Sequence, residues 1–254
     1  MTKKIIPKKS NYIQINDTQL YYEIYGEGQP LLLLHGFTQS SIAWLEYVKE
    51  YSDKFQVYLI DLRGHGKSSI FKEKFSVQEA SEDVLKLMKH LNVKKIKGIG
   101  LSFGGDVLLQ LSSMNPELIE SMIIIGANGD WNAQDFPAML NTFNYDNIDN
   151  FKWIEEYHSG GYKQIKSLLD QLPNYKIKLT EEELKRIKAK TLLVLGDKAE
   201  QISISSVVTL HETLKYSKLW IVPNTGHYAH DGDNRHEFLR LSNKFLSSEQ
   251  AKSY

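Results

Sequence analysis

The segment VKKIKGIGLSFGGDVLLQLSSMN, residues 93–115, carries the strongest structural pattern in the chain. Residues 93–99 are few and rich in β-branched side chains, which predicts a buried strand. Residues 107–114 have apolar side chains at helical spacing, which predicts a helix packed under that strand. Between them lies Gly100-Leu101-Ser102-Phe103-Gly104, a G-x-S-x-G pattern that puts a serine hydroxyl on a sharp, exposed turn. The segment therefore predicts a reactive Ser102, and a tight glycine-rich packing turn is the structural alternative.

Strand and helix patterns alternate on both sides of this segment. A hairpin is expected at residues 12–15 and 20–25, and further strands at 31–34, 56–60, 121–125, 191–195 and 218–222. Helices are expected at 41–51, 76–91, 204–214 and 234–246. Such alternation is typical of the α/β class, so we expect a mostly parallel central sheet flanked by helices.

The alternation is interrupted between residues 131 and 190, where no strand pattern is convincing. Helices are expected there at 137–143, 148–158, 162–172 and 180–188, the last beginning with a capping box of Thr180 and Glu183. We therefore expect a helical cap at 131–190 inserted into a core formed by 1–130 and 191–254. The insertion is rich in aromatic residues, and some of these are expected to line an apolar pocket rather than only pack the insertion onto the sheet. The candidates are Trp131, Phe136, Phe143 and Trp153.

Composition excludes several classes of partner. Lys plus Arg number 31 and Asp plus Glu also number 31, so the net charge gives no reason to expect nucleic acid or an anionic membrane. No apolar run has the length of a signal peptide or a membrane span, so no membrane insertion is expected. The chain has no cysteine, which excludes disulfides and a cysteine nucleophile and fits a cytoplasmic location. The oligomeric state does not follow from these data.

A serine nucleophile needs a base and an oxyanion site, and the sequence offers both. His227 follows Gly226 in the loop after the last predicted strand, where an imidazole can reach Ser102. The other histidines are expected to be structural, in glycine-bounded turns (His35, His65) or solvated or packed on helices (His90, His158, His211, His236). The backbone N–H groups of Phe103, at a helix N-terminus, and of Phe37, after the first central strand, are candidate oxyanion donors.

Five motifs in order, LLLLHGF, DLRGHGKS, GLSFGG, TLLVLGDK and IVPNTGH, resemble those of the α/β-hydrolase fold family. The resemblance covers about residues 12–246 and places the insertion where such enzymes carry a cap. It implies Ser102 as nucleophile, His227 as base, and Phe37 and Phe103 as oxyanion donors. It also implies that no cofactor is needed. Serine at this position speaks against the epoxide hydrolase and dehalogenase branches of the family, whose nucleophile is a carboxylate.

The chain departs from the family at the acid of the triad. The family usually carries an Asp three residues after the glycine of the penultimate-strand motif, and here that residue is Ala199. Three explanations compete: Glu200 reaches in, Asp130 after the fourth strand substitutes, or Ala199 is a natural or engineered substitution that disables the triad. Asp197 is disfavoured because the family usually has an acid there as well. We expect the third explanation, since GDKAEQIS otherwise fits an intact motif.

The expected function is a serine hydrolase of the carboxylesterase type, acting on a small, fairly apolar ester or acyl substrate through an acyl-enzyme. Carbon–carbon bond hydrolase, aminopeptidase, acyltransferase and perhydrolase activities of the same fold stay open. A non-enzymatic binder of a small ligand is the alternative from another class. A metal cluster built from His227, His230, Asp231 and Asp233 is disfavoured, so neither a metal nor a cofactor is expected.

Overall fold

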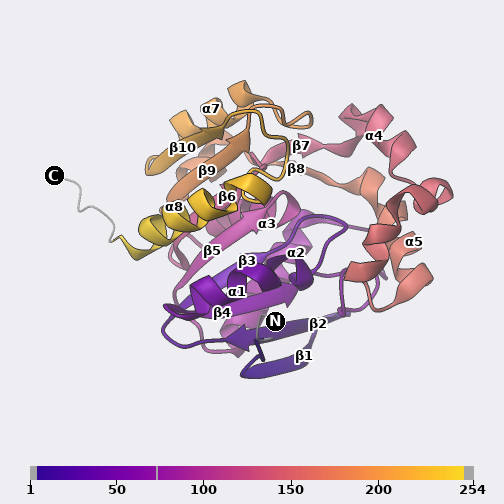
Figure 1. Ribbon diagram of the computed structural model, residues 1–254, viewed down its shortest axis with the longest axis horizontal. Helices are drawn as coiled ribbons and strands as arrows, with labels where there is room; N and C mark the ends of the chain where they lie inside the picture. Colours follow the sequence, from indigo (N-terminus) through magenta and orange to yellow (C-terminus); the bar gives the residue numbers. More distant parts are fainter. Residues whose placement is uncertain (1–4, 73, 249–254) are drawn as a thin grey trace.

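The computed structural model describes residues 5–72 and 74–248 and has a central sheet with helices on both faces (Figure 1). The strands of the central sheet are β1 (Lys9–Ile15), β2 (Thr18–Tyr25), β3 (Gln29–Leu34), β4 (Phe55–Asp61), β5 (Ile96–Leu101), β6 (Ile119–Ile125), β9 (Lys190–Gly196) and β10 (Ser217–Val222). They run in the order β1-β2-β4-β3-β5-β6-β9-β10. Pairing is parallel from β4 to β10, and β1 and β2 are antiparallel. The predicted fold class is confirmed.

Helices cover both faces because the central strands are apolar on both sides. The side chains of residues 31–34 in β3 have no exposed surface. Leu31 and Leu33 pack in one core cluster with α1 (Leu45–Ser52) and α8 (Arg235–Ser247). Leu32 and Leu34 pack in the other with α2 (Val77–His90), α3 (Phe103–Met114) and α7 (Ile204–Thr213). This alternation is the two-fold period of a strand, and it places β3 in the middle of the protein.

The segment around Ser102 differs from its predicted boundaries at both ends. β5 begins at Ile96 rather than at Val93, because Val93 N–H donates to Met88 O and closes the end of α2. α3 begins at Phe103, four residues earlier than predicted, so it starts directly after the serine. The turn between β5 and α3 is therefore a single residue, Ser102.

The helix predicted at 41–51 begins as a 3₁₀ helix, Ser41–Trp44, which continues into α1.

The expectation of no strand in residues 131–190 was wrong. β7 (Asp130–Asn132) and β8 (Lys176–Lys178) pair antiparallel as a small second sheet. Their sequences carry no strand pattern, and it is the pairing of two distant segments that makes them strands. This pair joins the start of the segment to residues 176–178.

The remainder of residues 131–190 is helical. It contains α4 (Pro137–Thr142), α5 (Gly161–Gln171) and α6 (Glu181–Lys185), with the predicted Thr180/Glu183 capping box in place before α6. The α-helix predicted at 148–158 is instead a 3₁₀ helix, Tyr145–Tyr157, which is interrupted at Phe151 by a non-helical backbone. In Figure 1, α4 and α5 stand to one side of the central sheet. Among the described residues, no helix combines the length and apolar character that a membrane crossing needs.

Candidate active site

Ser102 occupies a strained turn that projects its side chain from the end of β5. Its φ is 50° and its ψ −116°, a left-handed backbone that a side chain rarely adopts. Such a conformation costs about 1–3 kcal/mol and persists only where the surroundings hold it. Here the Ser102 N–H donates to Ile125 O at 2.7 Å, and the Asp106 N–H donates to Ser102 O at 3.0 Å. The turn is thus fixed from β6 on one side and from α3 on the other.

Two glycines make the sharp turn possible. A side chain at Gly100 would collide with the Gly104 carbonyl, and one at Gly104 would collide with the carbonyl of Leu34 in β3. The first turn of α3 therefore lies directly against β5 and β3. This close approach is the physical reason for the G-x-S-x-G spacing.

Gly104→Ala is expected to lower the free energy of unfolding by about 3 kcal/mol, because the added methyl group has to displace β3 or α3. In a chain of this size that corresponds to a fall in Tm of about 6–12 °C. Thermal denaturation followed by circular dichroism measures it. Gly226→Ala is the matched control, since nothing lies within 4 Å of its added methyl group. Equal Tm values for the two variants would contradict the close packing of α3.

Ser102 and His227 line the same cavity, which has a volume of about 230 Å³. His227 comes from the loop after β10 and Ser102 from the turn after β5. The cavity walls are largely apolar or aromatic, with side chains of Phe37, Trp131, Met139, Phe143, Trp153, Leu172, Tyr175, Ile202 and Tyr228. Three of the four predicted pocket residues are therefore present. Phe136 is the exception: it does not line the cavity, and its ring stacks on that of Trp131 with 5.5 Å between the ring centroids.

Of the two predicted oxyanion donors, Phe103 directly follows Ser102 and Phe37 lines the same cavity as Ser102. Phe103 is the first residue of α3, where a backbone N–H has no acceptor within the helix. Phe37 follows β3 and lines the cavity, and its ring meets that of Phe103 edge to face at 5.9 Å. The helix dipole at Phe103 favours negative charge at this point. The arrangement can stabilise an oxyanion on a substrate attacked by Ser102.

The loop that carries His227 is held against the turn after β9. The Asp197 carboxylate accepts from the Thr225 N–H at 3.2 Å, and the Lys198 N–H donates to Thr225 O at 2.9 Å. A side chain at Gly196 would collide with the Thr225 and Gly226 carbonyls. The Asp197 carboxylate therefore binds the backbone of this loop at Thr225.

Nδ1 of His227 is buried and has no hydrogen-bond partner within the described part of the chain. The ring packs against Gly126, where an added Cβ would lie 3.0 Å from Nδ1. Burial lowers the pKa of His227 to about 4, so the imidazole is neutral at physiological pH. A neutral imidazole can accept the proton of Ser102, but nothing here holds its tautomer.

Neither substitute acid proposed from the sequence reaches His227. Glu200 is exposed, and no hydrogen bond joins it to His227. Asp130 is exposed at the start of β7 and lines a different hollow, which the β7–β8 pair forms with α2 and α3. Ala199 is partly buried and packs on the core. The geometry thus disfavours Glu200 and Asp130 and leaves the position of the family acid occupied by a methyl group.

Most of the remaining histidines pack or bond as structural groups. His35 is buried, with Nδ1 2.8 Å from Gly36 O and with Nε2 accepting from the Leu62 N–H. His65 is buried with Nδ1 2.8 Å from Arg63 O, and His158 packs 5.9 Å from it. His90 and His236 are exposed, and His211 bonds to Ser217.

The alternative metal cluster is not assembled. His230 is buried with its ring 5.2 Å from that of Trp44, and Asp231 accepts from the Tyr47 hydroxyl. Over residues 5–72 and 74–248, no three His, Cys, Asp or Glu side chains gather as they would to hold a metal ion.

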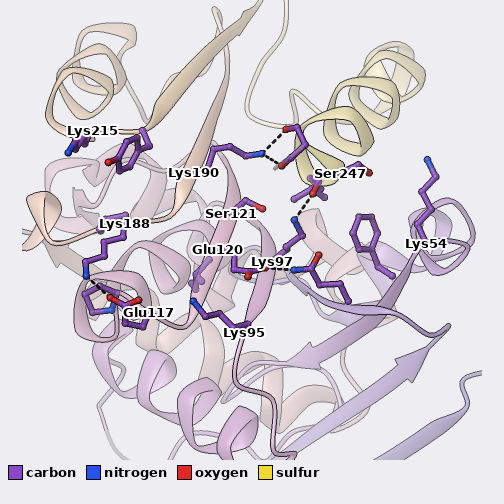
Figure 2. Close-up of a pocket in the computed structure, with 18 of the residues that line it drawn as sticks. Lys54, Lys95, Lys97, Glu117, Glu120, Ser121, Lys188, Lys190, Lys215 and Ser247 are labelled. Atoms are coloured by element: carbon purple, nitrogen blue, oxygen red, sulfur yellow. Dashed lines mark hydrogen bonds and ion pairs between the residues drawn. The ribbon is translucent and has the colours of Figure 1, made fainter. Parts of the chain in front are cut away.

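A larger hollow, of about 1070 Å³, lies at the opposite end of the strands (Figure 2). Its wall is rich in lysine and includes Lys54, Lys95, Lys97, Lys190 and Lys215. Two of these close the C-terminus of α8: Lys97 donates to Leu246 O at 2.5 Å and Lys190 to Phe245 O at 2.6 Å. The hollow is bordered by the first residues of β4, β6 and β9, whereas ligands of open α/β sheets bind at the carboxyl ends. It is separate from the cavity of Ser102.

The kcat/KM for ester hydrolysis is expected to hold down to about pH 4 and to fall below it. An imidazole can accept a proton only when it is neutral, and burial keeps His227 neutral until the pH drops to its pKa of about 4. A pH–rate profile with a short-chain ester measures this, with circular dichroism at each pH to separate protonation from unfolding. A midpoint near 6.5, the ordinary value for histidine, would show that a carboxylate or solvent reaches Nδ1.

Several cavity residues were missed by sequence reasoning. Asp106, Met139, Leu172, Tyr175, Gln201, Ile202 and Tyr228 all border the cavity. Asp106 could have been noticed, because it is the only charged residue of α3. The others carried no signal beyond being apolar, aromatic or polar residues in loops and helices.

Comparison with known proteins agrees with this architecture. The sequence model of the alpha/beta hydrolase fold matches residues 29–157. A soluble epoxide hydrolase of Corynebacterium sp. strain C12 is 34% identical over 111 residues, which are 44% of this chain and 39% of that protein. The chain thus spans about two fifths of the length of that relative. A putative esterase/lipase of Haemophilus influenzae is 23% identical over 240 residues, which are 85% of this chain and 83% of that protein.

Solved structures show the same fold over nearly the whole chain. The alpha/beta hydrolase MGS-M2 from a Medee basin deep-sea metagenome library superposes with a TM-score of 0.80 at 18% identity, over 96% of this chain and 99% of that one. The meta-cleavage product hydrolase CumD of Pseudomonas fluorescens IP01, as a mutant complexed with acetates, superposes with a TM-score of 0.76 at 21% identity, over 94% of this chain and 97% of that one.

Proposed function

Because the chain belongs to the alpha/beta hydrolase fold family, we propose that it is a serine hydrolase of small, fairly apolar esters or acyl compounds. The observation that carries the proposal is that Ser102, on its strained turn, and His227 border one cavity. The cavity volume of about 230 Å³ is below the ~300–1,000 Å³ of ordinary ligand pockets, which favours a small substrate. Its aromatic walls favour an apolar one.

The proposed reaction uses four groups of the chain. Ser102 Oγ attacks the substrate carbonyl while His227 takes its proton, and the N–H groups of Phe37 and Phe103 receive the developing oxyanion. The carbonyl reforms, the bond to the leaving group breaks, and His227 gives the proton to the leaving alcohol. A water then attacks the acyl-enzyme, again losing its proton to His227, and the acid product leaves as Ser102 recovers its hydrogen.

We propose in addition that residues 131–190 act as the cap of this site. Trp131, Met139, Phe143, Trp153 and Tyr175 all come from this segment and form one wall of the cavity. The core supplies Ser102 and His227, and residues 131–190 supply the aromatic and apolar side chains that set the shape of the cavity. Substrate preference should therefore depend on 131–190 more than on the core.

A panel of p-nitrophenyl esters with acyl chains of increasing length tests the proposal. We expect hydrolysis to be greatest for short acyl chains, because the cavity volume leaves no room for long ones. Because Ala199 occupies the position where the family carries its acid, we expect slow turnover.

Nδ1 of His227 has no hydrogen-bond partner among residues 5–72 and 74–248, which favours a second candidate, a non-enzymatic binder of small ligands on the same fold. Tight binding of a small ligand with no hydrolysis of any ester would support it. Release of acyl groups to an acceptor alcohol or to peroxide would instead indicate an acyltransferase or a perhydrolase. Carbon–carbon bond hydrolysis and aminopeptidase activity are tested with a diketone and an aminoacyl anilide.

A further inference from the structure

A buried carboxylate lies in the cavity one helical turn from the proposed nucleophile. Asp106 is four residues after Ser102 on α3, borders the cavity, and has only 2% of its surface exposed. The basic side chain among the described residues of the cavity wall is His227, which is neutral at physiological pH. Asp106 is thus the one anionic side chain among the described residues that border this cavity.

The carboxylate is only partly satisfied by the protein. Its Oδ2 accepts from the Tyr175 hydroxyl at 2.7 Å and its Oδ1 from the Gly129 N–H at 3.1 Å. A carboxylate has about four acceptor positions, so about two are unused. No Lys, Arg or His in the described part of the chain pairs with Asp106, and burial raises its pKa to about 6. At neutral pH the group is therefore mostly ionised although it lies out of water, an arrangement that is costly without a cation.

We propose that Asp106 binds a positively charged amino group of the substrate, so that the substrate class is short esters or acyl compounds carrying an ammonium group. The inference rests on the proposed function, because the same molecule presents its carbonyl to Ser102. Four residues of helix span about 6 Å, which places the ammonium group two or three carbons from the carbonyl. The aromatic walls pack the hydrocarbon between the two ends.

A purely structural role for Asp106 makes a different prediction. In that case the carboxylate only ties α3 to Gly129 and Tyr175, and the charge of the substrate has no influence. The two roles are separated by a pair of substrates of the same shape that differ in charge.

Ethyl 3-aminopropanoate and ethyl butanoate form such a pair, since an ammonium group replaces a methyl group. With the full chain at neutral pH, we expect kcat/KM to favour the amino ester by about 10- to 100-fold, the usual worth of a hydrogen-bonded charge pair. In Asp106→Asn the ratio of the two kcat/KM values is expected to fall to about one. Asp170→Asn, which changes an exposed carboxylate of α5, should keep the ratio of the unmodified chain.

Tyr175→Phe tests whether the fall of the ratio in Asp106→Asn comes from the lost hydrogen bond rather than from the lost charge. It removes one hydrogen bond from Asp106, which raises the pKa of the carboxyl group further, so this variant is compared with the unmodified chain at pH 8, where the carboxylate is retained and the preference for the amino ester should persist. Equal rates for the two esters in the unmodified chain would overturn the assignment, as would a preference that survives Asp106→Asn. If neither ester reacts and a fluorophosphonate does not label Ser102, the proposed function itself has failed. If neither reacts although Ser102 is labelled, only the assignment of Asp106 fails.

Discussion

Ala199→Asp is expected to raise kcat/KM for a short-chain ester by about 10²- to 10⁴-fold. The acid of a triad holds the imidazole in the tautomer that accepts the serine proton and stabilises the imidazolium that forms, and its loss costs up to ~10⁴ in turnover. In this chain Nδ1 of His227 is buried with no partner among the described residues, and the family position of the acid carries a methyl group. A carboxylate introduced at position 199 is expected to accept a hydrogen bond from Nδ1 of His227, which would hold the tautomer and stabilise the imidazolium.

The same substitution should move the acidic limb of the pH–rate profile upwards. An adjacent carboxylate favours the charged form of His227, so its pKa is expected to rise above its present value of about 4. Ala199→Asn is the matched control, because it has nearly the same shape without the charge, and it should leave kcat/KM within about tenfold of the unmodified chain. Unchanged activity in Ala199→Asp would contradict the missing-acid interpretation. Glu200 or Asp130 would then be the acid, and loss of activity in Glu200→Gln or Asp130→Asn would identify which.

Ser102→Ala is expected to lose more activity in the Ala199→Asp background than in the unmodified chain. Members of a triad act as a unit: removal of the serine costs ~10⁶ in turnover when the triad is complete, whereas loss of the acid alone already costs ~10⁴. We therefore expect Ser102→Ala to reduce turnover by about 10²-fold in the unmodified chain and about 10⁶-fold in Ala199→Asp. Steady-state kinetics on one ester measure both values.

Ser205→Ala serves as the control for this pair, because Ser205 lies on α7 away from the cavity. It should change neither background by more than about twofold. Equal losses from Ser102→Ala in the two backgrounds would mean that the serine and the restored acid do not act in one site.

The sequence predicted the fold because the signals for it are local. The apolar run at 31–34, the glycine at 100 and the capping box at Thr180 each act within a few residues of their position, and the structure has the predicted element at each. The helix boundary at Phe103 was less predictable. It depends on how closely α3 can approach β3, which is a tertiary contact rather than a propensity.

Features that depend on distant pairing were not predictable. β7 and β8 exist because residues 130–132 and 176–178 meet, and neither segment has a strand pattern alone. The carboxylate of Asp106 is bonded by Tyr175, 69 residues later in the chain. In the sequence, Asp106 lies just before the helix predicted at 107–114, so its place in a cavity became visible only in the folded chain.

The most direct test of the proposed function is labelling of the chain with a fluorophosphonate, followed by intact-mass and peptide mass spectrometry. We predict one adduct per chain, located on Ser102, absent in Ser102→Ala and formed faster in Ala199→Asp. An unlabelled chain, or an adduct on another serine that persists in Ser102→Ala, would contradict the assignment of Ser102 as a nucleophile.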